Sequence, residues 1–578
     1  MRKLTAILLL LSLLFTMILC GCSKKAENKT GMDETDGSNT TVSKADTSGM
    51  DFGFSDEDTS TTDSGSGTTV DISNNTTITS SGTKLYNITS GGSYTLSGAI
   101  TDTMVTVDAG EADVTIILDG ATIKNNDGPA IYVRSADKVT ITLASGTTNT
   151  VSDGSSYSIT DSDSTLDATI FSKSDLTING DGTLTVNGNY KHGIVSKDDL
   201  IISSGTLNVT ANNVGLNGKD CVKVNSGNIN INAGSDGIRA DNTEDTSKGY
   251  VYLYGGTINI TSDNDGIQAE TVINVENVNL TITAGGGSSG SLSHASESYK
   301  GLKACSDIYV TGGTFNIDSK DDCIHSNGTI TIKGGTYTLS SGDDGIHADT
   351  DLAISGSATK LTINKSYEGI EATNIVISDG TISIVASDDG LNAAGGNNST
   401  SGGGRPGQNK FTSSNGSITV SGGTIYIKMS GDGIDANGTL SITGGYITVS
   451  GANSGDTAIL DFDNTGTITG GTFVSTGSSN MTQNFSTTST QGAILVNASG
   501  SEGTAIKLTD YSGNTVVSYS ADQAFSCIVI SHPSITEGST YTLTVGSSTT
   551  TITMNSTVYS DGGKTHGGKG GKGNKGWR

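Results

Sequence analysis

Residues 321–348 read DDCIHSNGTITIKGGTYTLSSGDDGIHA, and this stretch carries a full period of a repeat that recurs through most of the chain. Its first motif is Asp-Gly-Ile-x-Ala, found at 236, 265, 344 and 432, with variants at 220, 300, 322, 368 and 389. The copies at 300, 322, 344, 368 and 389 start 22, 22, 24 and 21 residues apart. A second motif, Gly-Thr-Φ-x-Φ with Φ apolar, accompanies most copies, as in GTFNI and GTYTL.

A period of this length fits three short strands separated by three turns, which is one rung of a right-handed parallel β-helix. Alternation along a strand places Ile and Ala of Asp-Gly-Ile-x-Ala inside and x outside. No single rung can bury its apolar face, so neighbouring rungs must stack. The repeat therefore predicts an all-β, single-stranded right-handed parallel β-helix solenoid with about 22 residues per rung.

The composition agrees with many short strands and tight turns. Glycine accounts for 80 of 578 residues and proline for 3, while charged residues are only 16%. These values exclude collagen, which needs a glycine at every third position and abundant proline, and they do not suit a disordered chain or a helical enzyme. The net charge of −27 makes nucleic acid and anionic lipid poor partners for the folded part and makes cations good ones.

The N-terminus has the pattern of a secretory signal. Arg2 and Lys3 precede an apolar run over residues 4–19, and Leu-Cys-Gly-Cys follows at 19–22. This ending resembles the bacterial lipoprotein box, which implies that Cys22 is the lipid anchor and that the protein sits on the extracellular face of the bacterial membrane. An ordinary signal peptide with incidental cysteines is the alternative.

The remaining organisation follows from local composition. We expect the following segments: 1–21 signal peptide, 22–69 disordered tether, 70–190 N-terminal part and cap of the solenoid, 191–490 regular rungs, 491–558 a C-terminal β cap of antiparallel hairpins, and 559–578 a Gly/Lys-rich tail. Insertions interrupt the period at 242–250, 284–299 and 395–416. We expect a ligand groove between the first and third insertions.

A family resemblance rests on the succession LDGATI, GPAIYV, VTITLASGTTNT and IFSKSDLTINGDGTLTV, followed by the Asp-Gly-Ile-x-Ala rungs. Over about residues 90–555 the chain resembles a bacterial carbohydrate-binding β-helix family with a polysaccharide-lyase-like fold. The resemblance implies calcium-assisted binding of cellulose and of acidic, pectin-type polysaccharides.

Stacking turns the repeat into columns of side chains about 4.8 Å apart. The first residue of the motif is acidic in every copy but the one at 300, and we name this row of side chains the acidic column. Two carboxylates at that spacing repel by about 3.5 kcal/mol at an effective dielectric of 20, so the negative charge of the column has to be compensated. Calcium, which binds carboxylate oxygens, is one solution; turn chemistry, in which Asp before Gly accepts local backbone N–H groups, is the other. The predicted metal ligands are Asp236, Asp265, Asp321, Asp322, Asp343, Asp344, Asp388, Asp389 and Asp432.

Two further sets of side chains are candidates for sugar binding. The outward x column and the alternating tyrosines of GYVYLYGG would offer hydrogen bonds and stacking surfaces; the alternatives are a solvated face and packing beneath the adjacent insertion. His325 and His347 lie one rung apart but do not make a zinc site without a third ligand. The predicted carbohydrate-binding residues are Arg239, Lys303, His325, His347, Glu371, Asn392, Tyr250, Tyr252 and Tyr254.

The cysteines and Lys300 complete the candidate residues. Cys221, Cys305, Cys323 and Cys527 form an even set that allows disulfides, but Cys221 and Cys323 stand where other copies have glycine, which indicates small buried fillers. Lys300 interrupts the acidic column, either as an internal counter-ion or as a lyase base.

These patterns favour a monomeric, surface-anchored, non-catalytic protein that binds polysaccharide with the help of calcium. No motif isolates one active rung from the others. The alternatives are a pectate-lyase-like or polygalacturonase-like enzyme acting on uronates, and a structural wall adhesin.

Overall fold

The computed structural model describes residues 47, 50–55, 68–69, 76–78, 83–162, 164–289, 298–394, 415–453, 455 and 457–561. The chain divides into two units, Met1–Ser43 and Lys44–Arg578, and every described residue belongs to the second. The predicted anchor Cys22, most of the Gly/Lys tail and much of two insertions therefore lie outside the described residues. Among the described residues no helix has the length and apolar character needed to cross a membrane.

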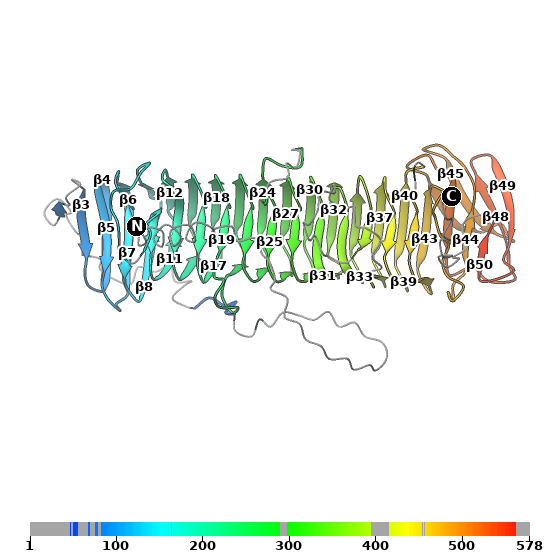
Figure 1. Ribbon diagram of the computed structural model, residues 1–578, viewed down its shortest axis with the longest axis horizontal. Coiled ribbons are helices and arrows are strands. Elements are labelled where there is room, and N and C mark those ends of the chain that lie inside the picture. The colour runs from blue at the N-terminus through cyan, green and yellow to red at the C-terminus, as the bar shows by residue number, and fades with distance from the viewer. Residues whose placement is uncertain are drawn as a thin grey trace, which may run out of the picture. The chain divides into compact units, whose positions relative to one another are not determined.

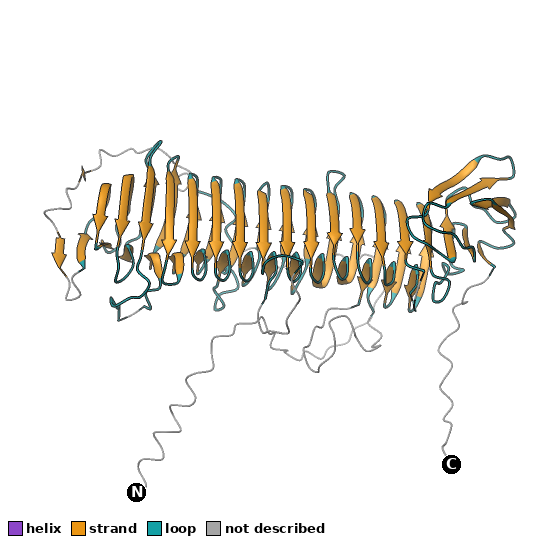
Figure 2. Cartoon of the chain, turned by 90° about the horizontal axis from the view of Figure 1, so that it is seen from above, coloured by secondary structure: helices purple, strands orange, loops and turns teal. Residues whose placement is uncertain are grey.

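The second unit confirms the predicted fold, because short strands stack in parallel to form a right-handed β-helix (Figures 1 and 2). The first column contains the Asp-Gly-Ile-x-Ala strands together with less regular strands before and after them: β7 (Ile131–Ser135), β10 (Ala168–Ser172), β13 (His192–Ser196), β16 (Leu216–Gly218), β19 (Ile238–Ala240), β22 (Ile267–Ala269), β25 (Leu302–Ala304), β28 (Ile324–Ser326), β31 (Ile346–Ile354), β33 (Ile370–Ile377), β35 (Leu391–Ala393), β38 (Ile434–Ala436) and β41 (Leu460–Phe462).

The second column contains the short alternating runs, and β31 and β33 extend into it. Its other strands are β8 (Lys138–Leu143), β11 (Asp175–Gly180), β14 (Asp199–Ile202), β17 (Cys221–Val224), β20 (Tyr250–Leu253), β23 (Ile273–Val275), β26 (Ile308–Val310), β29 (Ile330–Ile332), β36 (Ser417–Val420), β39 (Thr439–Ile442) and β42 (Thr465–Ile468).

The third column contains the Gly-Thr-Φ-x-Φ strands. They are β9 (Thr148–Ser152), β12 (Thr183–Gly188), β15 (Thr206–Ala211), β18 (Asn228–Ala233), β21 (Thr257–Ser262), β24 (Asn279–Ala284), β27 (Thr314–Ser319), β30 (Thr336–Ser341), β32 (Lys360–Lys365), β34 (Thr381–Val385), β37 (Thr424–Met429), β40 (Tyr446–Gly451) and β43 (Thr472–Gly477).

The core is a stack of identical apolar positions. Leu302 pairs with Ile324, and Ile324 pairs with Ile346, so each isoleucine of Asp-Gly-Ile-x-Ala lies on the one below. All three are fully buried, as alternation predicts. The glycine before this aliphatic residue is needed for space: a Cβ on Gly390, which precedes Leu391, would lie 2.3 Å from Ile427 Cγ2. The residue types on the inward side of the rung are therefore limited by side-chain size as well as by hydrophobicity.

The two ends depart from the regular rung. At the N-terminal end, β1 (Thr68–Thr69), β4 (Gly92–Thr101) and β6 (Val114–Lys124) pair in parallel, as do β3 (Lys84–Ile88) and β5 (Thr103–Asp108), while β2 (Thr76–Ile78) pairs with β3 antiparallel. At the C-terminal end, β47 (Cys527–Ser531) pairs antiparallel with β43 and with β44 (Ala493–Val496), and β50 (Val558–Ser560) joins β44. A separate antiparallel sheet contains β46 (Thr515–Ser520), β45 (Ala505–Asp510), β48 (Thr540–Val545) and β49 (Ser548–Thr553).

The sequence prediction is wrong for one variant of the repeat, DCVKV at 220, which lies in another column. Asp220 directly precedes β17, and Cys221 begins that strand in the second column, where it pairs with Tyr250. The true member of the first column on that rung is β16, which pairs with β19. DCVKV imitates the motif because both columns alternate small and aliphatic residues. Cys221 and Cys323 therefore do not occupy equivalent positions, although both are free and buried, as is Cys527.

A part of the predicted tether packs on the solenoid. Residues 50–54 read MDFGF, and this alternation gives an extended segment with one apolar face. Met50, Phe52 and Phe54 pack against the cluster that contains Tyr250 and Tyr252. The expectation of a solvated segment over 22–69 is therefore wrong for these residues, which we name the arm (residues 50–55).

Candidate functional site

Several aspartates of the acidic column use one carboxylate oxygen to join successive rungs. Asp265 Oδ1 accepts the backbone N–H of Lys300 at 2.7 Å, and Asp389 Oδ1 accepts that of Asp432 at 2.6 Å. The same bond joins Asp322 to Asp344 at 3.0 Å. These carboxylates therefore accept backbone N–H groups, as turn chemistry predicts. The donating N–H, however, belongs to the next rung and not to the local turn.

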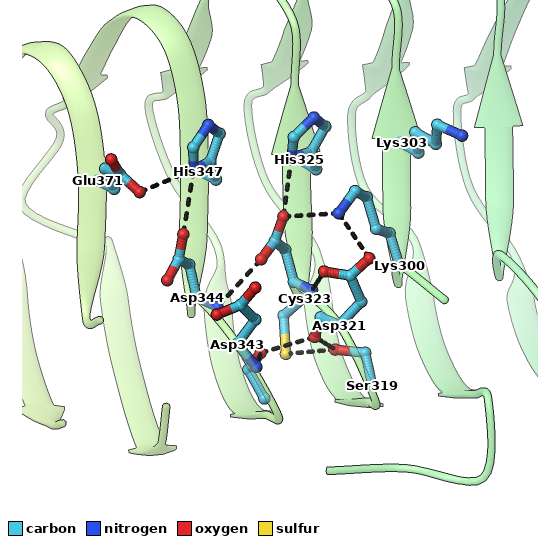
Figure 3. Close-up of polar contacts among 12 residues, drawn as sticks. Lys300, Lys303, Ser319, Asp321, Cys323, His325, Asp343, Asp344, His347 and Glu371 are labelled. Carbon is cyan, nitrogen blue, oxygen red and sulfur yellow. Dashed lines mark hydrogen bonds and ion pairs between the residues drawn. The ribbon is translucent and has the colours of Figure 1, made fainter. Parts of the chain in front are cut away.

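The other oxygen faces the x column. Of the five copies at 236, 265, 300, 322 and 344, four have a base at x. Arg239, His325 and His347 pair with the aspartate of their own motif, whereas Lys303 pairs with the aspartate of the preceding copy (His325 and His347 are shown in Figure 3). The N···O distances are 3.4 Å for Arg239–Asp236, 3.2 Å for Lys303–Asp265, 2.8 Å for His325–Asp322 and 3.0 Å for His347–Asp344.

These pairs correct the prediction that the x column faces solvent. His325, His347 and Asn392 are buried, and Arg239, Lys303 and Glu371 are partly buried. The aspartate stands at the corner before the strand, so period-two alternation does not apply to it and its carboxylate reaches the x side chain. Most of the predicted sugar-binding row is therefore engaged inside the protein.

Lys300 acts as the counter-ion of one rung. Its ammonium lies 2.8 Å from Asp321 and 2.8 Å from Asp322 (Figure 3). Burial alone would lower the pKa of Lys300, but the charges of Asp322 and Asp321 outweigh it and hold the pKa above the ordinary value. The burial of Asp322 is likewise outweighed by Lys300, so the pKa of Asp322 falls well below its usual range. A protonated, paired lysine fits the counter-ion alternative and not a lyase base.

The C-terminal part of the column has no such bases. The x residues change to Glu371, Asn392 and Asp435, and Asn392 lies in register between the other two. Among the described residues, no ion pair reaches Asp389, Asp432 or Asp435. Asn392 Nδ2 donates to Glu368, whereas Asn392 Oδ1 is buried without a hydrogen-bond partner in the described part of the chain.

The carboxyl groups of the same region have raised pKa values. Burial and the charge of Asp432 raise the pKa of Asp389 to about 8, and burial and Asp432 also raise that of Asp435 to about 8. The pKa of Asp432 rises to about 7, chiefly through burial. Carboxylate and amide oxygens are the types of ligand that calcium prefers. We name Asp389, Asn392, Asp432 and Asp435 the acidic end.

The remaining predicted metal residues divide between these environments. Asp236, Asp265 and Asp344 are buried beside x-column bases, whereas Asp321, Asp343 and Asp388 lie one residue earlier in their motifs and are partly buried. Burial and the charge of Asp322 raise the pKa of Asp343 to about 7.

The tyrosine strip is covered by the arm. Tyr250 and Tyr252 are buried, with ring centroids 5.4 and 5.5 Å from that of Phe52. Tyr250 also donates its hydroxyl to the backbone oxygen of Asp51 at 2.9 Å, and Lys223 pairs with the Asp51 carboxylate at 2.8 Å. Only Tyr254 keeps substantial exposure, at 48%. These tyrosines do lie on one face, but they bind a segment of the chain itself and do not form an open stacking surface.

A groove over the third column escaped the sequence analysis. It has a volume of about 320 Å³ and crosses β15, β18, β21 and β24. Asn230 Nδ2 donates to Asn208 Oδ1 and Asn259 Nδ2 donates to Asn230 Oδ1, both at 2.9 Å, so the asparagines form a ladder along the floor. The polar residues that line the groove are Asn208, Thr210, Asn230, Asn232, Asn259, Thr261, Thr281 and Thr283.

The signal for this groove was present in the sequence. The x position of Gly-Thr-Φ-x-Φ is Asn in GTLNV, GNINI and GTINI, three consecutive rungs.

Comparison with known proteins gives three findings. A sequence profile described as "carbohydrate-binding domain-containing protein" matches residues 75–345 and 327–405, together more than half of the chain. A protein of that description from Acetivibrio thermocellus is 45% identical over 58 residues, 10% of this chain and 20% of the relative, so the matched segment spans only a fifth of that relative. A solved structure of "the polysaccharide lyase-like protein from C. thermocellum", a gadolinium derivative, is 36% identical with a TM-score of 0.36, covering 42% of this chain and 90% of that one.

Proposed function

We propose that this chain, which belongs to the family of carbohydrate-binding domain-containing proteins, binds a polysaccharide in the groove over β15, β18, β21 and β24. The asparagine ladder supports this most directly. It presents amide groups in a regular row, rung by rung, at about 4.8 Å, and the neighbouring threonines of the groove add hydroxyl groups. Such a row can hydrogen-bond the repeated hydroxyls of an extended glycan. The proposed ligands are plant-type or acidic glycans such as cellulose or polygalacturonate.

Calcium is proposed at the acidic end. Asp389, Asp432 and Asp435 would supply carboxylate oxygens, and the unpartnered Oδ1 of Asn392 would supply an amide oxygen. A bound calcium ion would neutralise charge that no described basic side chain compensates. An open coordination position on it would also accept a uronate carboxylate, which would favour acidic glycans.

The bases that a lyase would use are already engaged. Lys300 is paired with two carboxylates, and Arg239 lies 3.4 Å from Asp236 and 3.6 Å from Asp241. A protonated or doubly paired base cannot accept the proton α to a uronate carboxylate without first losing these partners. These contacts support a non-catalytic binding protein over a uronate-cleaving enzyme.

The lipid anchor stays a proposal from the sequence. We propose that Cys22, outside the described residues, is lipidated and holds the protein at the extracellular face of the bacterial membrane. Replacing Cys22 with Ala should release the protein from the membrane fraction while its β-sheet circular dichroism stays unchanged. Retention of the variant in that fraction would contradict the anchor.

A pull-down on insoluble cellulose, polygalacturonate and xylan tests the binding site. The chain should be retained, and the double variant Asn230→Leu/Asn259→Leu should lose retention because it removes the ladder donors. Thr331→Leu, a partly buried position on β29 in the second column, serves as the matched control and should bind normally. Equal retention of all three proteins would refute the groove, and ultraviolet absorbance from unsaturated products would refute the non-catalytic proposal.

A further inference from the structure

Three ligating side chains meet on the rung where the bases of the x column end. His347 Nδ1 lies 3.0 Å from Asp344 Oδ2 and 3.1 Å from Glu371 Oε2 (Figure 3). Asp344 immediately precedes the strand that carries His347, and Glu371 stands in register with His347 on the next rung. The His347 side chain is only 2% exposed, so the three groups meet away from bulk solvent.

A proton on His347 satisfies this arrangement incompletely. The single hydrogen on Nδ1 can point at only one acceptor, yet two carboxylates converge on that nitrogen. Among the described residues, the ion pairs of Asp344 and Glu371 are made with His347 alone, whereas the two carboxylates of the preceding rung, Asp321 and Asp322, are paired with Lys300. The site therefore combines excess negative charge with a nitrogen donor.

The other ring nitrogen is already oriented. His347 Nε2 lies 3.3 Å from Asp349 Oδ1. A carboxylate on the outer nitrogen fixes the tautomer with the hydrogen on Nε2, and this leaves the Nδ1 lone pair directed at Asp344 and Glu371. The same arrangement is usual for histidines that bind metal ions in proteins.

From this geometry we propose that Asp344, His347 and Glu371 bind a divalent transition-metal ion of the zinc class, with a fourth position open to water. Zinc bonds nitrogen at about 2.0–2.1 Å and carboxylate oxygen at about 2.0–2.2 Å, which in a tetrahedron places N and O about 3.4 Å apart. The observed 3.0 and 3.1 Å separations need to widen by only a few tenths of an ångström. Calcium fits less well, because it takes six to eight oxygens and rarely nitrogen.

This site is separate from the acidic end and from the groove, and it does not depend on the proposed function. From the sequence, Asp344 was predicted to bind calcium, and His347 and Glu371 were predicted to bind sugar. The proposed site uses one histidine and two carboxylates in place of the two histidines considered from the sequence. The carboxylates come from the aspartate of the motif that contains His347 and from the x residue of the next rung.

Zinc titration of the metal-stripped full chain, without a polyhistidine tag, tests the proposal by calorimetry and by the metal content after dialysis. We expect an equivalent of zinc per chain that His347→Gln and Glu371→Gln each remove. Asp349→Ala should weaken binding by roughly 10–100-fold, because it leaves the ligands in place and removes only the group that orients the ring. Excess calcium should not displace the zinc.

His325→Gln is the matched control, since His325 lies one rung away in the same column with its rings stacked on His347 at 4.9 Å. This variant should keep its zinc. Loss of zinc in His325→Gln with retention in Glu371→Gln would overturn the proposed ligand set, and so would equal zinc content in the wild type and His347→Gln. Circular dichroism of each variant, together with the visible absorption of the cobalt-substituted chain, separates loss of a ligand from loss of the fold.

Discussion

Without calcium, the stability of the solenoid should fall as the pH rises, because the acidic end has to ionise. Asp435 has a pKa of about 8 in the folded protein, against 3.8 ordinarily, so the folded state holds a proton that the unfolded chain releases. Stability decreases with pH wherever the folded state binds more protons than the unfolded chain, which for this group means from about pH 4 to pH 8.

The size of the effect follows from the same values. A pKa difference of one corresponds to about 1.36 kcal/mol, so between pH 5 and pH 7.5 Asp435 alone should lower the free energy of unfolding by up to about 3 kcal/mol. Asp389 and Asp432 act in the same direction, but the three carboxyls repel one another and their contributions are not additive. Calcium should flatten the dependence, because it binds the ionised form.

The assay is urea unfolding of calcium-free protein at pH 5 and pH 7.5, repeated with added calcium. Asp435→Asn should reduce the loss of stability on going to pH 7.5, because an amide does not titrate. Asp119→Asn, at an exposed position, should leave the loss unchanged. If the calcium-free wild type is as stable at pH 7.5 as at pH 5, or more stable, the pKa values of these carboxyls are not raised in the folded protein.

Other perturbations test separate parts of the account. Lys300→Met should lower the free energy of unfolding by about 3–5 kcal/mol by leaving two carboxylates unpaired, whereas Lys219→Met, which removes an exposed pair with Glu244, should change it by less than about 1 kcal/mol; similar losses would contradict the counter-ion role. Phe52→Ala should release the arm and speed proteolysis before residue 60, and unchanged cleavage would argue against docking of the arm. Gly390→Ala should lower the urea midpoint, because the added Cβ meets Ile427 and the carbonyl of Gly433; an unchanged midpoint would mean that the rung can expand.

The fold could be predicted from the sequence because a repeat reports the same geometry many times. Each copy of Asp-Gly-Ile-x-Ala constrains the same position of the rung, so a single misplaced copy, DCVKV at 220, did not change the result. The inward isoleucines were likewise identified by alternation alone.

The candidate site was harder to predict, because it depends on contacts between columns. Alternation gives the direction of a side chain within a strand but not the reach of Asp322 from the corner to His325. The docking of Phe52 on Tyr250 joins residues almost two hundred positions apart, and periodicity carries no information about such a contact. The asparagine ladder was visible as a repeated x residue, but only the structure shows that it lies in a groove.

Binding of polysaccharide in the groove can be measured by calorimetric titration of the calcium-loaded chain with an acidic oligosaccharide and with a cello-oligosaccharide. We expect saturable binding of at least one of them, weakened about tenfold or more in Asn230→Leu/Asn259→Leu, because each lost hydrogen bond contributes about 0.5–1.5 kcal/mol. Absence of binding to both, or equal affinity of the wild type and the double variant, would contradict it.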